Sequence, residues 1–116
     1  MIGQVEYTLK ADINISSSGD NAILASPIPT DNNLYYAIDH INLIPDAAVT
    51  LQIVSGSTNY GGAYSLTANQ GFILENVSGD ENGIITCGAD EAFLLNLSAA
   101  VQVSGFIKYR IRNQYL

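Results

Sequence analysis

Turn-forming residues interrupt this chain so often that helices have almost no room to form. Gly, Pro, Asn, Asp and Ser favour turns because they tolerate or impose bent backbone conformations. An average helix takes about 11 residues, whereas an average strand takes about 5. The spacing of the turns therefore predicts an all-β chain. The turn-forming clusters are Ser16 to Asn21, Pro27 to Asn33, Pro45-Asp46, Ser55 to Gly62, Ala68 to Gly71, Ser78 to Gly83 and Gly88-Ala89-Asp90.

Several segments between these turns alternate apolar and polar residues with a period of two, as a strand with one buried face requires. One alternating strand runs from Val49 to Ile53. The stretch from Leu34 to Ile44 changes phase near His40, which predicts a β-bulge or a strand that passes between sheets. The last strand is the clearest. Its predicted inward set is Val101, Val103, Gly105, Ile107, Tyr109 and Ile111, and its outward set is Gln102, Ser104, Phe106, Lys108, Arg110 and Arg112.

Together these segments predict a jelly-roll-like two-sheet antiparallel β-sandwich of about eight strands. We expect residues 13–116 to form this sandwich as a single domain. Residues 1–12 form either an edge strand or an arm that orders on a neighbouring subunit, because Val5, Tyr7 and Leu9 alternate with polar residues. The remaining predicted strands are Ile13 to Ser16, Ala22 to Ala25, Tyr64 to Thr67, Phe72 to Asn76, Ile84 to Cys87 and Ala92 to Leu97.

Charge and composition argue against several classes of partner. The chain has 4 Lys and Arg against 11 Asp and Glu, a formal net charge of −7. Nucleic acid is not expected as a partner, because phosphate contacts need clustered cations. No apolar run approaches the roughly 20 residues of a spanning helix, so no membrane partner is expected. The start, Met1 to Tyr7, lacks the basic and apolar blocks of a secretory signal.

No catalytic, metal or cofactor motif stands out in the sequence. His40 and Cys87 are the only residues of their types, and lone residues of these types most often pack structurally. Most acidic residues lie in turns, where carboxylates cap and bend the backbone. The acidic turn Ser78 to Gly83 lacks the ligand alternation of a calcium loop. We therefore expect no enzyme activity, no bound metal and no cofactor.

Two tyrosines support an alternative hypothesis. Tyr60 and Tyr64 flank a Gly61-Gly62 pair, and aromatic side chains in a loop of a β-sandwich could present a platform to a sugar ring. Packing at a loop edge or at a subunit contact explains the same residues. Tyr60 and Tyr64 are thus the candidate glycan-contact residues if the chain is a glycan-binding module or a fibre or tail component.

Three blocks of sequence carry a family resemblance. The run Ala48 to Thr58 is followed by Tyr64 to Gly71 and later by Glu91 to Gly105, which contains Leu95-Asn96-Leu97-Ser98-Ala99-Ala100-Val101. In this order the blocks resemble the small head proteins of tailed bacteriophages, of the capsid decoration or cement type. The resemblance spans Leu34 to Ile111, and its final block is the most specific part. The chain departs from the family between Gly71 and Ala89, where it is more polar.

The resemblance implies a structural virion protein that stabilises the phage head by clamping neighbouring major capsid subunits. Members of this family are jelly-roll-like, often homotrimeric, and sit on the capsid exterior after assembly in the host cytoplasm. The expected partners are therefore further copies of the chain and the major capsid protein.

The outward row of the last strand is the predicted protein contact. An aromatic residue beside cations matches the composition of protein interfaces, whereas a solvated strand face is the alternative interpretation. Tyr7 is a further candidate from the N-terminal segment. The candidate contact residues are Phe106, Lys108, Arg110, Arg112 and Tyr7.

Overall fold

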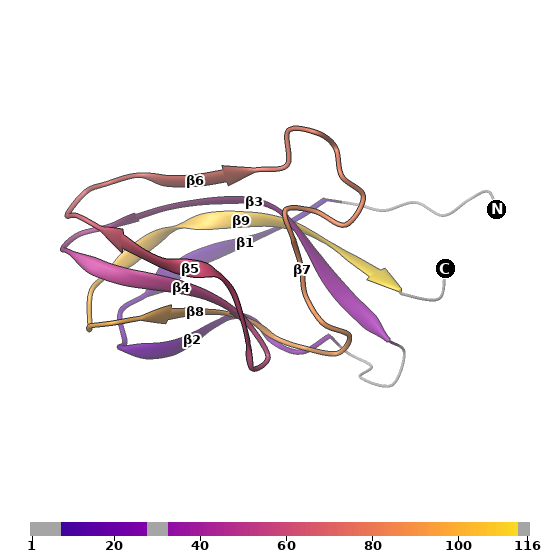
Figure 1. The fold of residues 1–116 in the computed structure, drawn as a ribbon, viewed down its shortest axis with the longest axis horizontal. Helices are drawn as coiled ribbons and strands as arrows, with labels where there is room; N and C mark the ends of the chain where they lie inside the picture. Colours follow the sequence, from indigo (N-terminus) through magenta and orange to yellow (C-terminus); the bar gives the residue numbers. More distant parts are fainter. Residues whose placement is uncertain (1–7, 28–32, 114–116) are drawn as a thin grey trace.

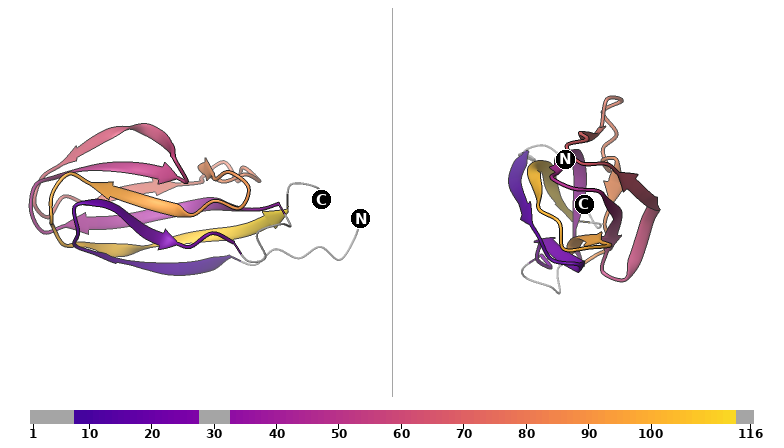
Figure 2. Two further views of the ribbon diagram at one scale, coloured as in Figure 1. Left: turned by 90° about the horizontal axis from the view of Figure 1, so that it is seen from below. Right: turned by 90° about the vertical axis from the view of Figure 1, so that its left-hand side faces the viewer.

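A computed structural model describes residues 8–27 and 33–113, and it consists of two antiparallel sheets packed face to face (Figure 1). All the regular secondary structure within these residues is β-strand, which confirms the predicted all-β sandwich. The strands run along the length of the molecule (Figure 2). They are β1 (Leu9–Ile15), β2 (Gly19–Leu24), β3 (Leu34–Pro45), β4 (Val49–Ser55), β5 (Thr58–Leu66), β6 (Phe72–Glu75), β7 (Ile85–Thr86), β8 (Phe93–Leu97) and β9 (Val103–Asn113).

The order of the strands is that of a jelly roll. One sheet has the order β1-β9-β3-β6, with β7 also paired to β3, and the facing sheet has the order β2-β8-β4-β5. The first and last strands are neighbours, and the chain crosses repeatedly from one sheet to the other, as in a double Greek key. Because β6 and β7 both pair with β3, together they take the place of one strand of the first sheet.

The core lies between the sheets and is filled by the inward residues of both. Val103 and Ile107 are fully buried there, as the alternation of the last strand predicts. Ile111 differs from its prediction and is 41% exposed, although Tyr36 opposite it on β3 is buried. Figure 1 shows that the end of β9 extends beyond the β4–β5 turn. The largest fully buried side chains are Phe93, Ile13, Ile38, Ile41, Leu43, Leu51, Ile53, Leu95, Leu97, Ile107, Val103 and Pro45.

The phase change near His40 is a β-bulge. The register of β3 with β9 shifts between Ile38, which faces Tyr109, and His40, which faces Lys108. Asp39 is therefore an extra residue on β3, while the strand stays in one sheet throughout. A bulge of this kind re-aims the side chains around it, and this one places Asp39 and His40 side by side on the outer face of the sheet.

The predicted turn from Ser55 to Gly62 is too long. The turn is confined to Gly56 and Ser57, and β5 already begins at Thr58. The register of β5 with β4 jumps from Tyr64 opposite Leu51 to Tyr60 opposite Ile53. The Gly61-Gly62 pair therefore belongs to a bulge inside the strand. Glycine is common in bulges as well as in turns, because it adopts positive φ angles without steric cost, as Gly61 does here.

The N-terminal part of the chain begins the first sheet. Strand β1 pairs with β9 from Leu9, opposite Tyr109, to Ile15, opposite Val103, and forms one edge of the sheet. Residues 9–12 of the segment considered as an arm or an edge strand therefore lie in the sheet. Tyr7 and the residues before it lie outside the described residues.

The close approach of β9 to β3 generates the first prediction. A Cβ added to Gly105 would collide with the backbone carbonyl of Asn42 and lie 2.7 Å from the Cα of Leu43. We expect Gly105→Ala to lower the free energy of unfolding by about 1–3 kcal/mol, the usual cost of overpacking. Gly71→Ala is the matched control, because a Cβ there meets nothing within 4 Å. Urea unfolding measures both variants, and equal stability would contradict the prediction.

Candidate protein-contact surface

All the lysines and arginines of the chain lie on one outer surface. The sequence contains four, Lys10 in β1 and Lys108, Arg110 and Arg112 in β9. Lys10 faces Lys108 directly across the two strands, and both alternate with core residues. The four cations therefore lie on the solvent side of the β1-β9-β3-β6 sheet. We call this surface the basic face.

Strand pairing orders the basic face into rows that cross the sheet. Residues directly opposite one another in paired strands point to the same side. The rows therefore bring together side chains that are far apart in sequence. One row is Glu75, His40, Lys108 and Lys10, and the next is Ile73, Asn42, Phe106 and Asp12.

Phe106 is the centre of the contacts on this face. Its ring stacks on the imidazole of His40, with ring centroids 5.4 Å apart and an angle of 8° between the planes. The Nζ atom of Lys10 lies 4.7 Å from the centroid of the Phe106 ring, a cation–π contact. The Nδ1 atom of His40 is 3.5 Å from Oε1 of Glu75. These contacts fix the aromatic ring as a rigid part of the surface.

Arg110 anchors the bulge of β3. Its Nε donates to Oδ2 of Asp39 at 2.7 Å, and its Nη2 donates to Oδ1 at 2.9 Å. The side-chain amide of Asn76 donates to the same carboxylate at 3.0 Å. This two-point pairing of guanidinium and carboxylate has the geometry of a strong charged hydrogen bond.

Arg112 holds the loop that connects β6 and β7. Its Nη1 donates to the carbonyl oxygen of Glu81 at 2.9 Å and to Oδ1 of Asn82 at 3.3 Å. The hydroxyl of Tyr35 donates to the same Asn82 oxygen at 3.1 Å. Arg110 and Arg112 therefore have partners within the chain, so half of the predicted contact row binds the protein's own loop.

Within the part of the chain that the structure describes, the two lysines, unlike the two arginines, do not hold the loop between β6 and β7. Lys10 and Lys108 are both exposed and stand directly opposite each other, an arrangement of like charges that weakens strand pairing. Two exposed apolar side chains lie on the same face, Ile73 at 59% and Ile44 at 44% exposure. Sequence alternation identified Lys108 and Phe106, but it gave no sign that Lys10, His40 and Ile73 would join them.

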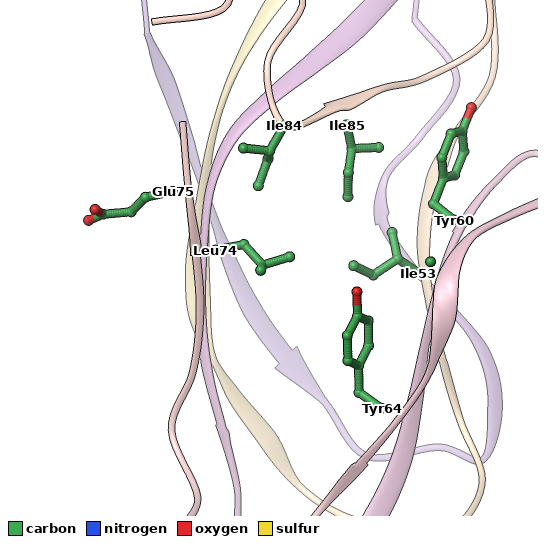
Figure 3. A pocket seen from close by; sticks show the side chains of 8 residues that line it. Ile53, Tyr60, Tyr64, Leu74, Glu75, Ile84 and Ile85 are labelled. Carbon is green, nitrogen blue, oxygen red and sulfur yellow. The ribbon is translucent and has the colours of Figure 1, made fainter. Parts of the chain in front are cut away.

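Tyr60 and Tyr64 do not form an outward platform. Tyr64 points from β5 into a cleft of about 310 Å³ at the open edge of the sandwich, and Tyr60 lines one side of the same cleft (Figure 3). The cleft also contains Leu74 and Ile84, whereas Glu75 points away from it (Figure 3). The Tyr60 hydroxyl donates to the carbonyl oxygen of Thr86 at 3.0 Å. The two tyrosines thus line a largely apolar cleft between the edges of the two sheets.

His40 and Cys87 do not meet. His40 lies on the basic face, whereas Cys87 is buried in the core. Burial raises the pKa of the Cys87 thiol to about 11, and the Glu91 carboxylate adds to the rise while a hydrogen bond with Ser55 opposes it. The thiol therefore stays protonated at neutral pH, and the thiolate is the nucleophilic form of cysteine.

A buried polar cluster lies next to this cysteine. Ser55 is fully buried, and its hydroxyl donates to Oε1 of Glu91 at 3.1 Å and accepts from the amide of Gly88 at 3.2 Å. The Glu91 carboxylate fills the space that a Cβ would need at both Gly56 and Gly88. The cluster therefore ties the end of β4 to the segment that enters β8, a structural role.

Fold and geometry define the chain as a jelly-roll β-sandwich whose lysines and arginines all lie on one outer face, together with Asp12, Asp39 and Glu75. Comparison with protein-family models, curated proteins and solved structures finds no match to this chain. Within the described residues, no three His, Cys, Asp or Glu side chains converge as metal ligands would. The same residues contain no helix that is long and apolar enough to cross a membrane.

The Asp39–Arg110 pair predicts a pH-dependent stability. Burial alone would raise the pKa of Asp39, but hydrogen bonds from Arg110 and Asn76 and the charge of Arg110 outweigh burial and hold the pKa below its usual value of 3.8. A lowered carboxylate pKa stabilises the fold above pH 4 or so, and this stabilisation is lost as the pH falls through the folded-state value. Asp39→Asn should therefore lower the free energy of unfolding by about 1 kcal/mol at pH 7. The effect is modest because the side chains of Asp39 and Arg110 are both partly exposed to solvent, which screens their interaction.

Urea unfolding at pH 7 and near pH 3 measures this effect. The difference between wild type and Asp39→Asn should shrink at the lower pH, because pH 3 lies below the usual Asp pKa of 3.8 and the carboxylate of the unfolded chain is then mostly protonated. Asp46→Asn is the control, because Asp46 is exposed in a turn and its side chain makes no hydrogen bond within the described residues. An equal destabilisation at both pH values would contradict the assignment.

Proposed function

We propose that the chain is a structural virion protein that decorates the exterior of a bacteriophage capsid and stabilises it by binding major capsid subunits. The proposal rests on two features: the segment from Leu34 to Ile111 resembles phage capsid decoration proteins in sequence, and the chain folds as a jelly roll. A sandwich of paired strands is stiff, and its faces and loops can meet different neighbours at the same time. A stiff body with several contact faces is what a cement protein requires.

The structural observation that favours one contact surface is the Lys10–Lys108 pair beside Phe106. Two exposed lysines placed opposite each other destabilise the isolated sheet. An acidic partner would relieve this repulsion, and the neighbouring Phe106 and Ile73 supply aromatic and aliphatic contact area. Aromatic side chains with cations around them are typical of protein interfaces. We therefore assign the lysine end of the basic face to the capsid contact.

The loop held by Arg110 and Arg112 would bound this contact. The loop covers the end of the basic face that is farther from Lys10. Val77, at the start of the loop, is 86% exposed and adds one more apolar contact. In this proposal the two arginines position a loop that reaches the capsid, and the two lysines meet the capsid directly.

Replacing the two lysines tests the proposed contact. Lys10→Ser with Lys108→Ser should leave a folded protein and weaken its co-sedimentation with capsids assembled without it by about tenfold or more, because the partner's acidic groups lose their counter-charges. Rising salt should weaken wild-type binding more than binding of the variant. Density-gradient co-sedimentation measures both effects.

The control for this experiment has the same net charge. Ala99→Asp with Ala100→Asp also lowers the net charge by two, in an exposed turn between β8 and β9. If both double variants bind equally weakly, overall charge and not the basic face controls binding. Undiminished binding by the lysine variant would refute the assigned surface.

The resemblance also leads us to propose a homotrimer. A closed ring lets one patch on each copy serve every contact, which is an economical way to build a stable unit from a small domain. Light scattering of the purified protein should then give three times the chain mass of 12.4 kDa. A mass of one chain at micromolar concentration would contradict the trimer but leave the capsid contact open to the sedimentation test.

A further inference from the structure

The outer face of the second sheet is hollowed and has a different chemistry from the basic face. The hollow has a volume of about 550 Å³, within the range of small-molecule sites. All the chain's lysines and arginines lie on the other sheet, so the hollow contains none of them. Its lining comes from four strands and the β4–β5 turn. The lining residues are Asp20, Thr50, Gln52, Val54, Gly56, Ser57, Asn59, Ala63, Asn96 and Ser98.

The bulge in β5 shapes this hollow. Residues 61–63 of β5 lie opposite the single residue Gln52 of β4, so the two strands are locally out of register. The side-chain amide of Gln52 donates to the carbonyl oxygen of Tyr60 at 3.0 Å. Its Oε1 makes no hydrogen bond within the described residues and remains available as an acceptor.

Asp20 and Asn96 form a second polar group in the hollow. They are paired across β2 and β8, and Nδ2 of Asn96 donates to Oδ1 of Asp20 at 2.8 Å. Oδ2 of Asp20 and Oδ1 of Asn96 have no hydrogen-bond partner within the described residues. The side chains of Asn59 and Ser57 likewise make no hydrogen bond in that part of the chain. The hollow therefore presents several donors and acceptors together, with only one charge.

We propose that this hollow binds a neutral saccharide. Each sugar hydroxyl both donates and accepts a hydrogen bond, and amide side chains such as Asn59 and Asn96 can do the same. A single carboxylate with no cation disfavours an anionic ligand, and the exposed Ala63 provides a small apolar contact for the C–H side of a sugar ring. The tyrosines first considered for a glycan take no part in this site.

A peptide strand fits this hollow less well than a saccharide. Its floor is the face of a sheet whose backbone groups are already paired in the β2-β8-β4-β5 ladders. Strand addition needs a free sheet edge, because it uses backbone hydrogen bonds. Recognition in the hollow must instead come from side-chain amides, hydroxyls and the carboxylate. The saccharide site lies on the opposite side of the sandwich from the proposed capsid contact and does not depend on it.

Nuclear magnetic resonance of the ¹⁵N-labelled full chain tests the proposal. The probes are maltotriose, cellotriose and chitotriose, each titrated to millimolar concentrations because polar surface sites of this kind bind weakly. At least one of them should shift the side-chain amide signals of Gln52, Asn59 and Asn96. Asn59→Ala should weaken that binding by about tenfold, the effect of losing a hydrogen bond or two. Its remaining spectrum should be unchanged, because Asn59 is exposed.

The matched control is Asn42→Ala, which removes an amide from the outer face of the other sheet and should leave the titration unchanged. No shift with any of the three sugars, shifts centred on the basic face, or equal binding by Asn59→Ala would each overturn the proposal. Titration of the Lys10→Ser, Lys108→Ser variant separates the two proposals. It should bind the sugar like wild type even if it no longer binds capsids.

Discussion

The long ladder between β3 and β9 is the interaction on which the rest of the structure depends. It pairs Leu34 with Asn113 at one end and Pro45 with Val103 at the other, and both strands lie inside their sheet. Each has core residues on one side and the basic face on the other. Because the two strands come from opposite halves of the chain, their pairing closes the jelly roll and sets the register of β1 and β6 on either side.

The bulge at Asp39 is where both ends of the loop between β6 and β7 are attached to β3. Opposite the bulge, the partner strand stops at Glu75 and resumes at Ile85. The amide of Asn76 bonds to the carbonyl of Asp39, and that of Ile84 bonds to the carbonyl of Ile38. The loop between β6 and β7 thus leaves and rejoins the sheet at the bulge, where Arg110 also binds. One extra residue in β3 therefore decides both the course of the loop and the partner of an arginine.

The two outer faces give the sandwich two different surfaces. The first sheet carries the chain's four lysines and arginines with Phe106 and Ile73, which suits contact with an acidic protein. The second carries amides, hydroxyls and one carboxylate around a shallow hollow. The two surfaces are separate because the hydrophobic core lies between the two sheets. The proposed capsid contact and the proposed saccharide site can therefore be altered independently.

The sequence by itself determined the fold class, the alternation of the last strand apart from Ile111, and a break in phase near His40, because alternation and turn residues are local signals. The strand register then showed that this break is a bulge. The same local signals wrongly placed Gly61-Gly62 in a turn, because β-bulges and turns both use backbone conformations that glycine adopts easily. Only the tertiary structure decided which outward residues share a row, which arginines bind the loop, and that Tyr60 and Tyr64 face a cleft. Those outcomes depend on strand register between distant segments, and periodicity along one strand does not specify which residue of another strand lies opposite.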